Sequence, residues 1–150
     1  MDAIVKFVKK TFDSVQGFFE PVDYLKLWFR LWVGQIFYLS GRSKAGENFF
    51  EINDFQGTLF EEEYGISFVD PELMAQLALY AETLFPLMII AGLGARIGAA
   101  GLLAMTLFIQ LFIYPGHFIE HATWMAVLIP LMLFGAGKIS LDHIISGKLK

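Results

Sequence analysis

The sequence predicts an all-α integral membrane protein: a four-helix bundle with an N-terminal amphipathic interfacial helix and a partly ordered extracytoplasmic loop between the first two spans. Of its 150 residues, 56% are hydrophobic and only 17% are charged, whereas about 25% are charged in an ordinary soluble domain. Between residues 73 and 136 the only charged side chains are Glu82, Arg96 and Glu120. That stretch suits three membrane crossings of about 20 residues each.

The N-terminal segment, residues 1–20, predicts a helix that lies on the inner leaflet of the membrane. Its apolar side chains recur at helical spacing and alternate with lysines, as in an interfacial helix. The apolar positions are Ile4, Val5, Val8, Phe12, Val15 and Phe19. Because the segment lacks both an uncharged apolar core and a small-residue cleavage site, it does not resemble a signal peptide. The alternative is a helix packed on the cytoplasmic end of the bundle.

Four apolar stretches predict the spans, which we place at 24–40, 73–95, 97–114 and 121–137. The first span contains Lys26 and Arg30 and is the most polar of the four. The glycine-rich stretch 92–98 imitates a dinucleotide-binding fingerprint, but no strand precedes it. It therefore predicts the tight turn between the second and third spans. The outer loop 41–72 and the tail 138–150 complete a single membrane domain.

The basic residues are sorted between the two ends of these spans. One side carries Lys6, Lys9, Lys10, Lys26, Arg96, Lys138, Lys148 and Lys150, and the other only Arg42 and Lys44. Because lysine and arginine are enriched on the cytoplasmic side of membrane proteins, both termini are predicted to be cytoplasmic. The loop 41–72, which holds most of the acidic residues, is then predicted to lie outside.

Arg30 and Glu82 are the two charged residues predicted to lie deep inside the spans. Counted at 1.5 Å per residue, Arg30 lies about 10 Å from one membrane face and Glu82 about 14 Å from the other. Because charged residues within a span usually face the bundle and pair, we expect these two to pair with each other. They then form a pocket that binds a headgroup or handles protons, or a buried ion pair that only fixes helix register.

Further polar side chains on the four spans are predicted to line such a pocket beside Arg30 and Glu82. The candidates are Gln35 on the first span, Tyr80 on the second, Gln110 on the third, and His121 and Trp124 on the fourth. The competing interpretation is that the glutamines only form hydrogen bonds between helices, which is their commoner role in membranes.

The residues His117, Glu120 and His121 spell H-x-x-E-H, the inverted zincin pattern. A protease is disfavoured because the only distal carboxylate ligand, Asp142, would lie about 30 Å away along the last span. A weaker metal site and a simple interfacial turn are the other two interpretations of this motif.

The outer loop is both aromatic and acidic between residues 49 and 70. Its rings predict a cap folded over the outer mouth of the bundle, and they belong to Phe49, Phe50, Phe55, Phe60, Tyr64 and Phe68. The run Glu61, Glu62 and Glu63 either binds a cationic partner or is a solvated face.

Composition excludes several classes of function. The chain has no cysteine, which excludes disulfides, thiol redox chemistry and cysteine-bound iron–sulfur clusters. No haem is expected, because His121 and His143 flank opposite ends of the last span. The net charge is −4, with no basic run, so nucleic acid is not an expected partner.

A series of motifs resembles the DoxX family over residues 24–146. They are RLWVGQIFYLSG (30–41) with Lys44, ETLFP (82–86), GLGAR (92–96), MTLFIQ (105–110), HATW (121–124) and GKISLD (137–142). Leu59-Phe60 and Glu63-Tyr64 in the loop resemble one bacterial branch of the family. The resemblance implies a multi-pass protein of the bacterial inner membrane, related to the membrane subunit of a thiosulfate:quinone oxidoreductase.

Three functional hypotheses follow from this resemblance and the residues. The first is a quinone-binding subunit of a redox complex, in which Glu82 and Arg30 hold or protonate the headgroup and Gln35, Tyr80, Gln110, His121 and Trp124 line the site. Electrons would pass to a soluble or membrane redox partner, and whether the chain itself catalyses is left open. The second is a scaffold or small-solute transporter that recruits a partner through its acidic loop. The third is a metal-handling protein that uses His117, Glu120 and His121. A homo-oligomer is compatible with all three.

Overall fold

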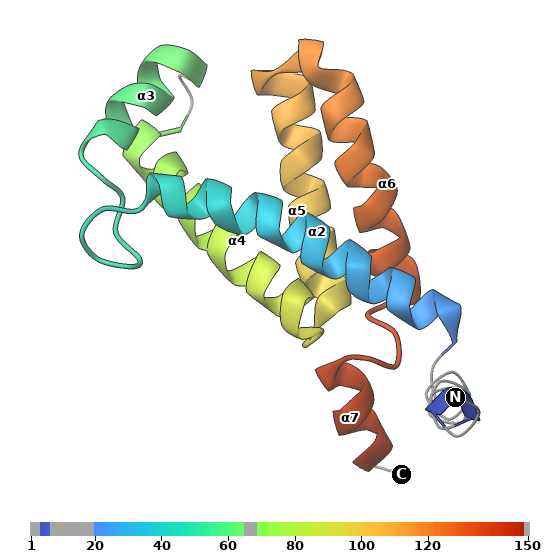
Figure 1. Cartoon of the computed structure of the whole chain (residues 1–150). Coiled ribbons are helices and arrows are strands. Elements are labelled where there is room, and N and C mark those ends of the chain that lie inside the picture. Colours follow the sequence, from blue (N-terminus) through green and yellow to red (C-terminus); the bar gives the residue numbers. More distant parts are fainter. Residues whose placement is uncertain (1–3, 7–19, 65–68, 149–150) are drawn as a thin grey trace.

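The computed structural model describes residues 4–6, 20–64 and 69–148, and within them the chain is helical apart from loops and one isolated β-bridge between Ala45 and Ile52 (Figure 1). The α-helices are α2 (Pro21–Lys44), α3 (Phe55–Tyr64), α4 (Pro71–Ala91), α5 (Ala95–Phe108), α6 (Phe118–Phe134) and α7 (Leu141–Lys148). A π-helical segment, η1 (Ile109–Ile113), continues α5, and a 3₁₀ turn, η2 (Pro115–His117), leads into α6.

Three helical segments are long and apolar enough to cross a membrane: Pro71–Ala91, Ala95–Ile113 and Pro115–Phe134. They coincide with the spans predicted at 73–95, 97–114 and 121–137, with ends that differ from the predicted ones by one to six residues. The predicted span 24–40 falls within α2, which has 24 residues but carries more charge than the other three. Its crossing of the membrane stays a prediction. Of the predicted interfacial helix 1–20, residues 4–6 are helical and most of the others lie outside the described residues.

The long helices form two packed pairs, α2 with α4 and α5 with α6, and α4 also packs against α5. In Figure 1 the pairs lie close together at the end where the chain turns from α4 into α5, and they diverge toward α3 and η2. The buried core where they meet draws on all four helices, with Val33 and Phe37 from α2, Ile89 from α4, Leu102 from α5, and Leu128 and Leu131 from α6.

The predicted turn between the second and third spans is present, and the C-terminal residues hold it. Gly92 and Gly94 have φ angles of 68° and 61°, which favour glycine. The Asp142 carboxylate accepts hydrogen bonds from the Gly94 N–H at 2.8 Å and the Ala95 N–H at 3.3 Å. Asp142 therefore caps the N-terminus of α5.

The outer segment folds partly as the predicted cap. Phe60 of α3 is buried against Ala75 and Ala78 of α4. Phe49, Phe50 and Phe55 stay about half exposed or more. Phe68 and the side chains of Glu63 and Tyr64 lie outside the described residues.

One face of α2 packs closely on α4 because it carries small residues. The buried positions of α2 recur at helical spacing and are Asp23, Arg30, Val33, Gly34, Phe37, Gly41 and Lys44. A methyl group added at Gly41 would lie only 2.9 Å from the backbone oxygen of Glu82. The absence of a side chain at Gly41 therefore sets how near the last turns of α2 approach Glu82.

Replacing Gly41 by alanine is expected to destabilise the fold by about 1–3 kcal/mol, because overpacking forces α2 away from α4. The measurement is unfolding of the purified protein by titration with a denaturing detergent. Gly147→Ala is the matched control, since a methyl group at Gly147 meets no atom within 4 Å. Equal stability of the two variants would show that the contact is not tight.

Candidate functional site

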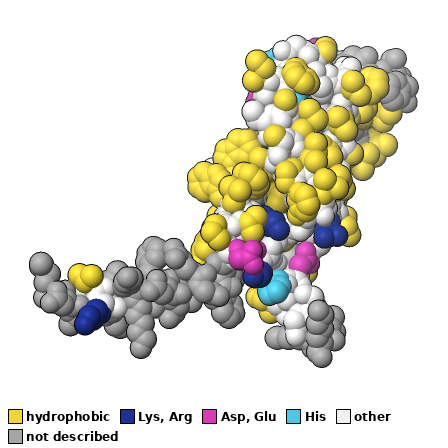
Figure 2. Space-filling view, turned by 90° about the vertical axis from the view of Figure 1, so that its right-hand side faces the viewer, with side chains coloured by type: hydrophobic (Ala, Val, Ile, Leu, Met, Phe, Trp, Pro, Cys, Tyr) yellow, Lys and Arg dark blue, Asp and Glu magenta, His cyan; other side chains and the backbone are white. Residues whose placement is uncertain are grey.

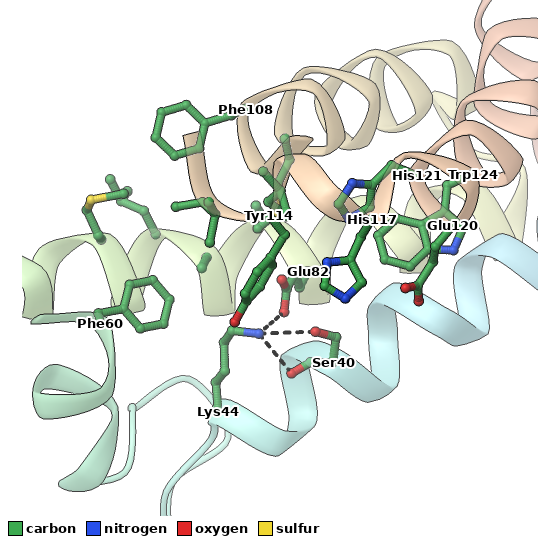
Figure 3. Close-up of a pocket in the computed structure, with 17 residues that line it drawn as sticks. Ser40, Lys44, Phe60, Glu82, Phe108, Tyr114, His117, Glu120, His121 and Trp124 are labelled. Carbon is green, nitrogen blue, oxygen red and sulfur yellow. Dashed lines mark hydrogen bonds and ion pairs between the residues drawn. The ribbon is translucent and has the colours of Figure 1, made fainter. Parts of the chain in front are cut away.

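A cavity of about 630 Å³ lies where the two helix pairs diverge (Figure 3). We call it the central cavity. Most of its wall is apolar and comes from α3, α4, α5 and η1, through Phe60, Met74, Leu77, Ala78, Ala81, Met105, Phe108, Ile109 and Ile113. Its polar and amphipathic lining residues are Ser40, Lys44, Glu82, Tyr114, His117, Glu120, His121 and Trp124. Small-molecule sites have this size and this mixture of an apolar wall with a few polar groups.

A buried ion pair between α2 and α4 forms one side of the central cavity. Lys44 Nζ lies 2.7 Å from Glu82 Oε2, and the two side chains are 11% and 4% exposed. Lys44 Nζ also donates to the hydroxyl and the carbonyl oxygen of Ser40, at 3.1 and 3.3 Å (Figure 3). Ser40 and Lys44 meet because they stand one helical turn apart. The site thus holds a cation and an anion together in an apolar surrounding.

His121 lies on the α6 side of the central cavity and is 3% exposed. Its Nδ1 is 2.6 Å from Gln110 Oε1, while Gln110 Nε2 donates to the carbonyl oxygen of Pro115 at 2.8 Å. Because the amide oxygen can only accept, Nδ1 of His121 is the donor in this hydrogen bond. The ring also packs 5.1 Å from Trp124. Gln110 therefore fixes the orientation of His121.

The H-x-x-E-H residues do not form a metal centre in the described part of the chain. His117 and Glu120 are exposed beside the buried His121, and the two imidazole rings are 6.3 Å apart. Among the described residues there is no group of three or more His, Asp or Glu side chains arranged to hold a metal ion. Asp142, the distal ligand considered for a protease, caps α5 instead.

The predicted pairing of Arg30 with Glu82 is wrong. Arg30 lies near the opposite end of α4, where its guanidinium donates to the carbonyl oxygens of Ile89, Ile90, Ala136 and Ile139. Counting residues from each membrane face placed the two charges at similar depths. The antiparallel packing of α2 on α4 instead brings Lys44 opposite Glu82. Arg30 joins the end of α4 to the loop 135–140 that follows α6, and it is not among the residues that line the central cavity.

The other predicted site residues divide into two groups. His121 and Trp124 line the central cavity, and Gln110 supports it through His121. Gln35 is exposed on α2, and Tyr80 is 40% exposed and packs 5.9 Å from Phe50. Neither of these two lines the cavity.

Sequence reasoning missed the two partners of Glu82 in the cavity wall, Ser40 and Lys44, and it also missed Tyr114. Ser40 and Lys44 are both part of the motif that resembles the DoxX family, but Lys44 falls within the predicted outer loop 41–72. The signal that points to them is their spacing of four residues, which continues the buried face of α2 for one more turn beyond the predicted end of the span.

One of three comparisons with known proteins gives a match. The DoxX family model matches residues 25–115, which cover α2 to η1 and so include Ser40, Lys44 and Glu82. Neither the comparison with curated proteins nor that with solved structures gives a match. The family and the three apolar helices indicate a membrane protein. The match spans more than half of the chain, and the chain belongs to the DoxX family.

Proposed function

We propose that the central cavity binds a quinone and that the protein is the membrane subunit of a redox complex. The observation that carries this proposal is an apolar cavity with polar groups on different walls, the ion pair Lys44–Glu82 on one and His121 on another. A quinone has a flat, largely apolar ring with a carbonyl oxygen at each end. The described residues therefore provide an apolar wall for the ring and separate hydrogen-bonding groups for its two carbonyl oxygens.

Each polar residue has a defined role in this proposal. The Lys44 ammonium, which already donates to Glu82 and Ser40, supplies a hydrogen bond to a ligand oxygen. Glu82 Oε2 accepts from Lys44 and is the atom at which a proton is taken up or released. His121, held by Gln110, orients the ligand from the other wall. A bound quinone would take up two electrons and two protons on reduction to the quinol, and it would supply the electron-carrying chemistry that the side chains lack.

We further propose that the protein spans the bacterial inner membrane several times, with both termini cytoplasmic. Lys26, Arg96 and Lys138 line one hollow together at the end of the bundle opposite the central cavity. Arg42 and Lys44 stand at the other end of α2. This sorting of basic residues supports the orientation, because the positive-inside rule puts the richer end in the cytoplasm. The central cavity then opens toward the outer half of the membrane.

Mass spectrometry of lipid extracts tests the proposal on the protein purified in a mild detergent. We expect a quinone to co-purify, and we expect protein stripped of lipid to take it up again when a short-chain quinone is added. Another membrane protein purified in parallel from the same cells controls for quinone carried over in the micelles. If the stripped protein retains no more quinone than that control after reloading, the proposal is overturned.

A further inference from the structure

A second hollow lies at the opposite end of the bundle, where α2 begins and α6 ends. We call it the basal hollow, and its volume is about 720 Å³. It is bounded by the start of α2, the turn between α4 and α5, the loop 135–140 and the start of α7, and three of its lining residues are Lys26, Arg96 and Lys138. The proposed function does not use this hollow.

The carboxylates of the basal hollow already have partners. Glu20 pairs with Lys138 at 3.1 Å. Asp23 accepts from the backbone N–H groups of Lys138 at 2.9 Å and Glu20 at 3.2 Å. Asp142 caps α5. Burial alone would raise the pKa of the Asp23 carboxyl, but these two hydrogen bonds and the charges of Lys138 and Lys26 bring it below its usual value. Asp23 is therefore an ionised structural group.

Two cations of the basal hollow are left without such partners. Over the described residues, neither Lys26 nor Arg96 has a hydrogen-bond acceptor or a carboxylate within ion-pair distance. Both lie against one short loop. A methyl group added at Gly135 would lie 3.1 Å from Arg96 Nε, and one added at Gly137 would lie 3.0 Å from Lys26 Cδ. The two cations therefore flank the same loop, which Arg30 holds through the Ala136 carbonyl oxygen.

The rim of the basal hollow is apolar and exposed. Ile97 and Phe134 are each 66% exposed, and Val22 is 45% exposed, although all three line the hollow. Figure 2 shows the same arrangement on one face of the molecule, where charged side chains gather just below a broad hydrophobic surface. A ligand that fills this hollow meets positive charge and exposed apolar side chains together.

We propose that the basal hollow binds the phosphate group of an anionic membrane phospholipid. Arg96 and Lys26 donate charge-assisted hydrogen bonds to the phosphate oxygens. The acyl chains lie against the apolar rim, beside Ile97 and Phe134. Basic pockets between membrane helices suit such headgroups. A free phosphate ion would use the same two cations but would gain nothing from the rim, so the rim favours the lipid.

Native mass spectrometry of the full chain tests this site with phosphatidylglycerol as the probe and phosphatidylcholine as the net-neutral comparison. The wild-type protein is expected to retain phosphatidylglycerol in preference to phosphatidylcholine. The double variant Arg96→Gln/Lys26→Gln is expected to lose at least about tenfold in this retention, because it lacks both charged donors. Glu61→Gln, an exposed charge at the opposite end, is the matched control and is expected to retain the lipid.

Melting of the lipid-free variants checks that they remain folded, which we expect because neither cation forms a hydrogen bond or a close ion pair with the described residues. Equal retention of phosphatidylglycerol by the wild type and by a folded double variant would overturn the proposal. Equal retention of the two lipids by the wild type would overturn it as well. Millimolar inorganic phosphate is expected to displace no lipid, and complete displacement would assign the hollow to the free ion instead.

Discussion

Replacing Lys44 by methionine is expected to destabilise the fold by about 3–5 kcal/mol, because removing one partner of a buried ion pair leaves the other charge uncompensated. Glu82 is 3% exposed and has Lys44 as its ion-pair partner among the described residues. Glu82→Gln is expected to destabilise the fold for the same reason, since it leaves the buried ammonium of Lys44 without its ion-pair partner. Unfolding by titration with a denaturing detergent measures both losses.

The double variant Lys44→Met/Glu82→Gln supplies the control for this prediction. With both charges removed, no buried ion is left unpaired, and stability is expected to return close to that of the wild type. If the losses of the two single variants simply add in the double variant, the two side chains do not interact as the structure indicates. A folded double variant is also the form in which ligand binding can be compared without the confounding effect of instability.

Replacing Arg30 by methionine is expected to be at least as disruptive, with no effect on the ligand site itself. The guanidinium donates to four carbonyl oxygens, those of Ile89, Ile90, Ala136 and Ile139. The Ile89 carbonyl oxygen keeps its hydrogen bond from the Gly92 N–H at 3.1 Å. The other three oxygens lose the Arg30 donor, and each buried acceptor left unsatisfied costs about 1–3 kcal/mol, so a loss of several kcal/mol follows. Arg30→Lys keeps the charge but presents a compact ammonium in place of a planar fork. It is therefore expected to recover only a small part of this loss.

Stability and quinone binding of Arg30→Lys together separate a structural role from a role in the site. We expect the folded fraction of this variant to bind quinone with wild-type affinity, because Arg30 does not line the central cavity. If Arg30→Lys has wild-type stability but has lost its affinity for quinone, Arg30 contacts the quinone headgroup, as the sequence alone predicts.

The hydrophobic pattern was sufficient to predict the helices but not their pairing. A long apolar stretch shows directly how long a membrane-spanning helix can be, so three candidate spans could be located with ends that differ from those in the structure by one to six residues. Which charge meets Glu82 depends on the register of α2 against α4. That register is set by close contacts such as Gly41 on the Glu82 backbone, and no spacing within a single helix encodes it.

The site could be predicted in part, for a related reason. His121 and Trp124 were found because polar and aromatic residues inside an apolar span are conspicuous. Lys44 was missed because a lysine next to a loop is usually solvated. The extra turn of α2 brings Lys44 into the wall of the cavity, of which Phe60 from α3 forms another part. Gln35 and Tyr80 were included as polar residues of a span, but the orientation of their helices turns them away.

Titration of the intrinsic fluorescence with a short-chain quinone tests the central claim most directly, because Trp124 lines the central cavity. The wild-type protein is expected to show saturable quenching, and Trp124→Phe to lose most of it. The folded double variant Lys44→Met/Glu82→Gln keeps Trp124 but lacks the charged groups, and its affinity is expected to fall at least about tenfold. Tyr80→Phe, outside the cavity, is expected to bind as the wild type does. Quenching that never saturates, or equal affinity in the wild type and the double variant, would contradict a quinone site at Lys44 and Glu82.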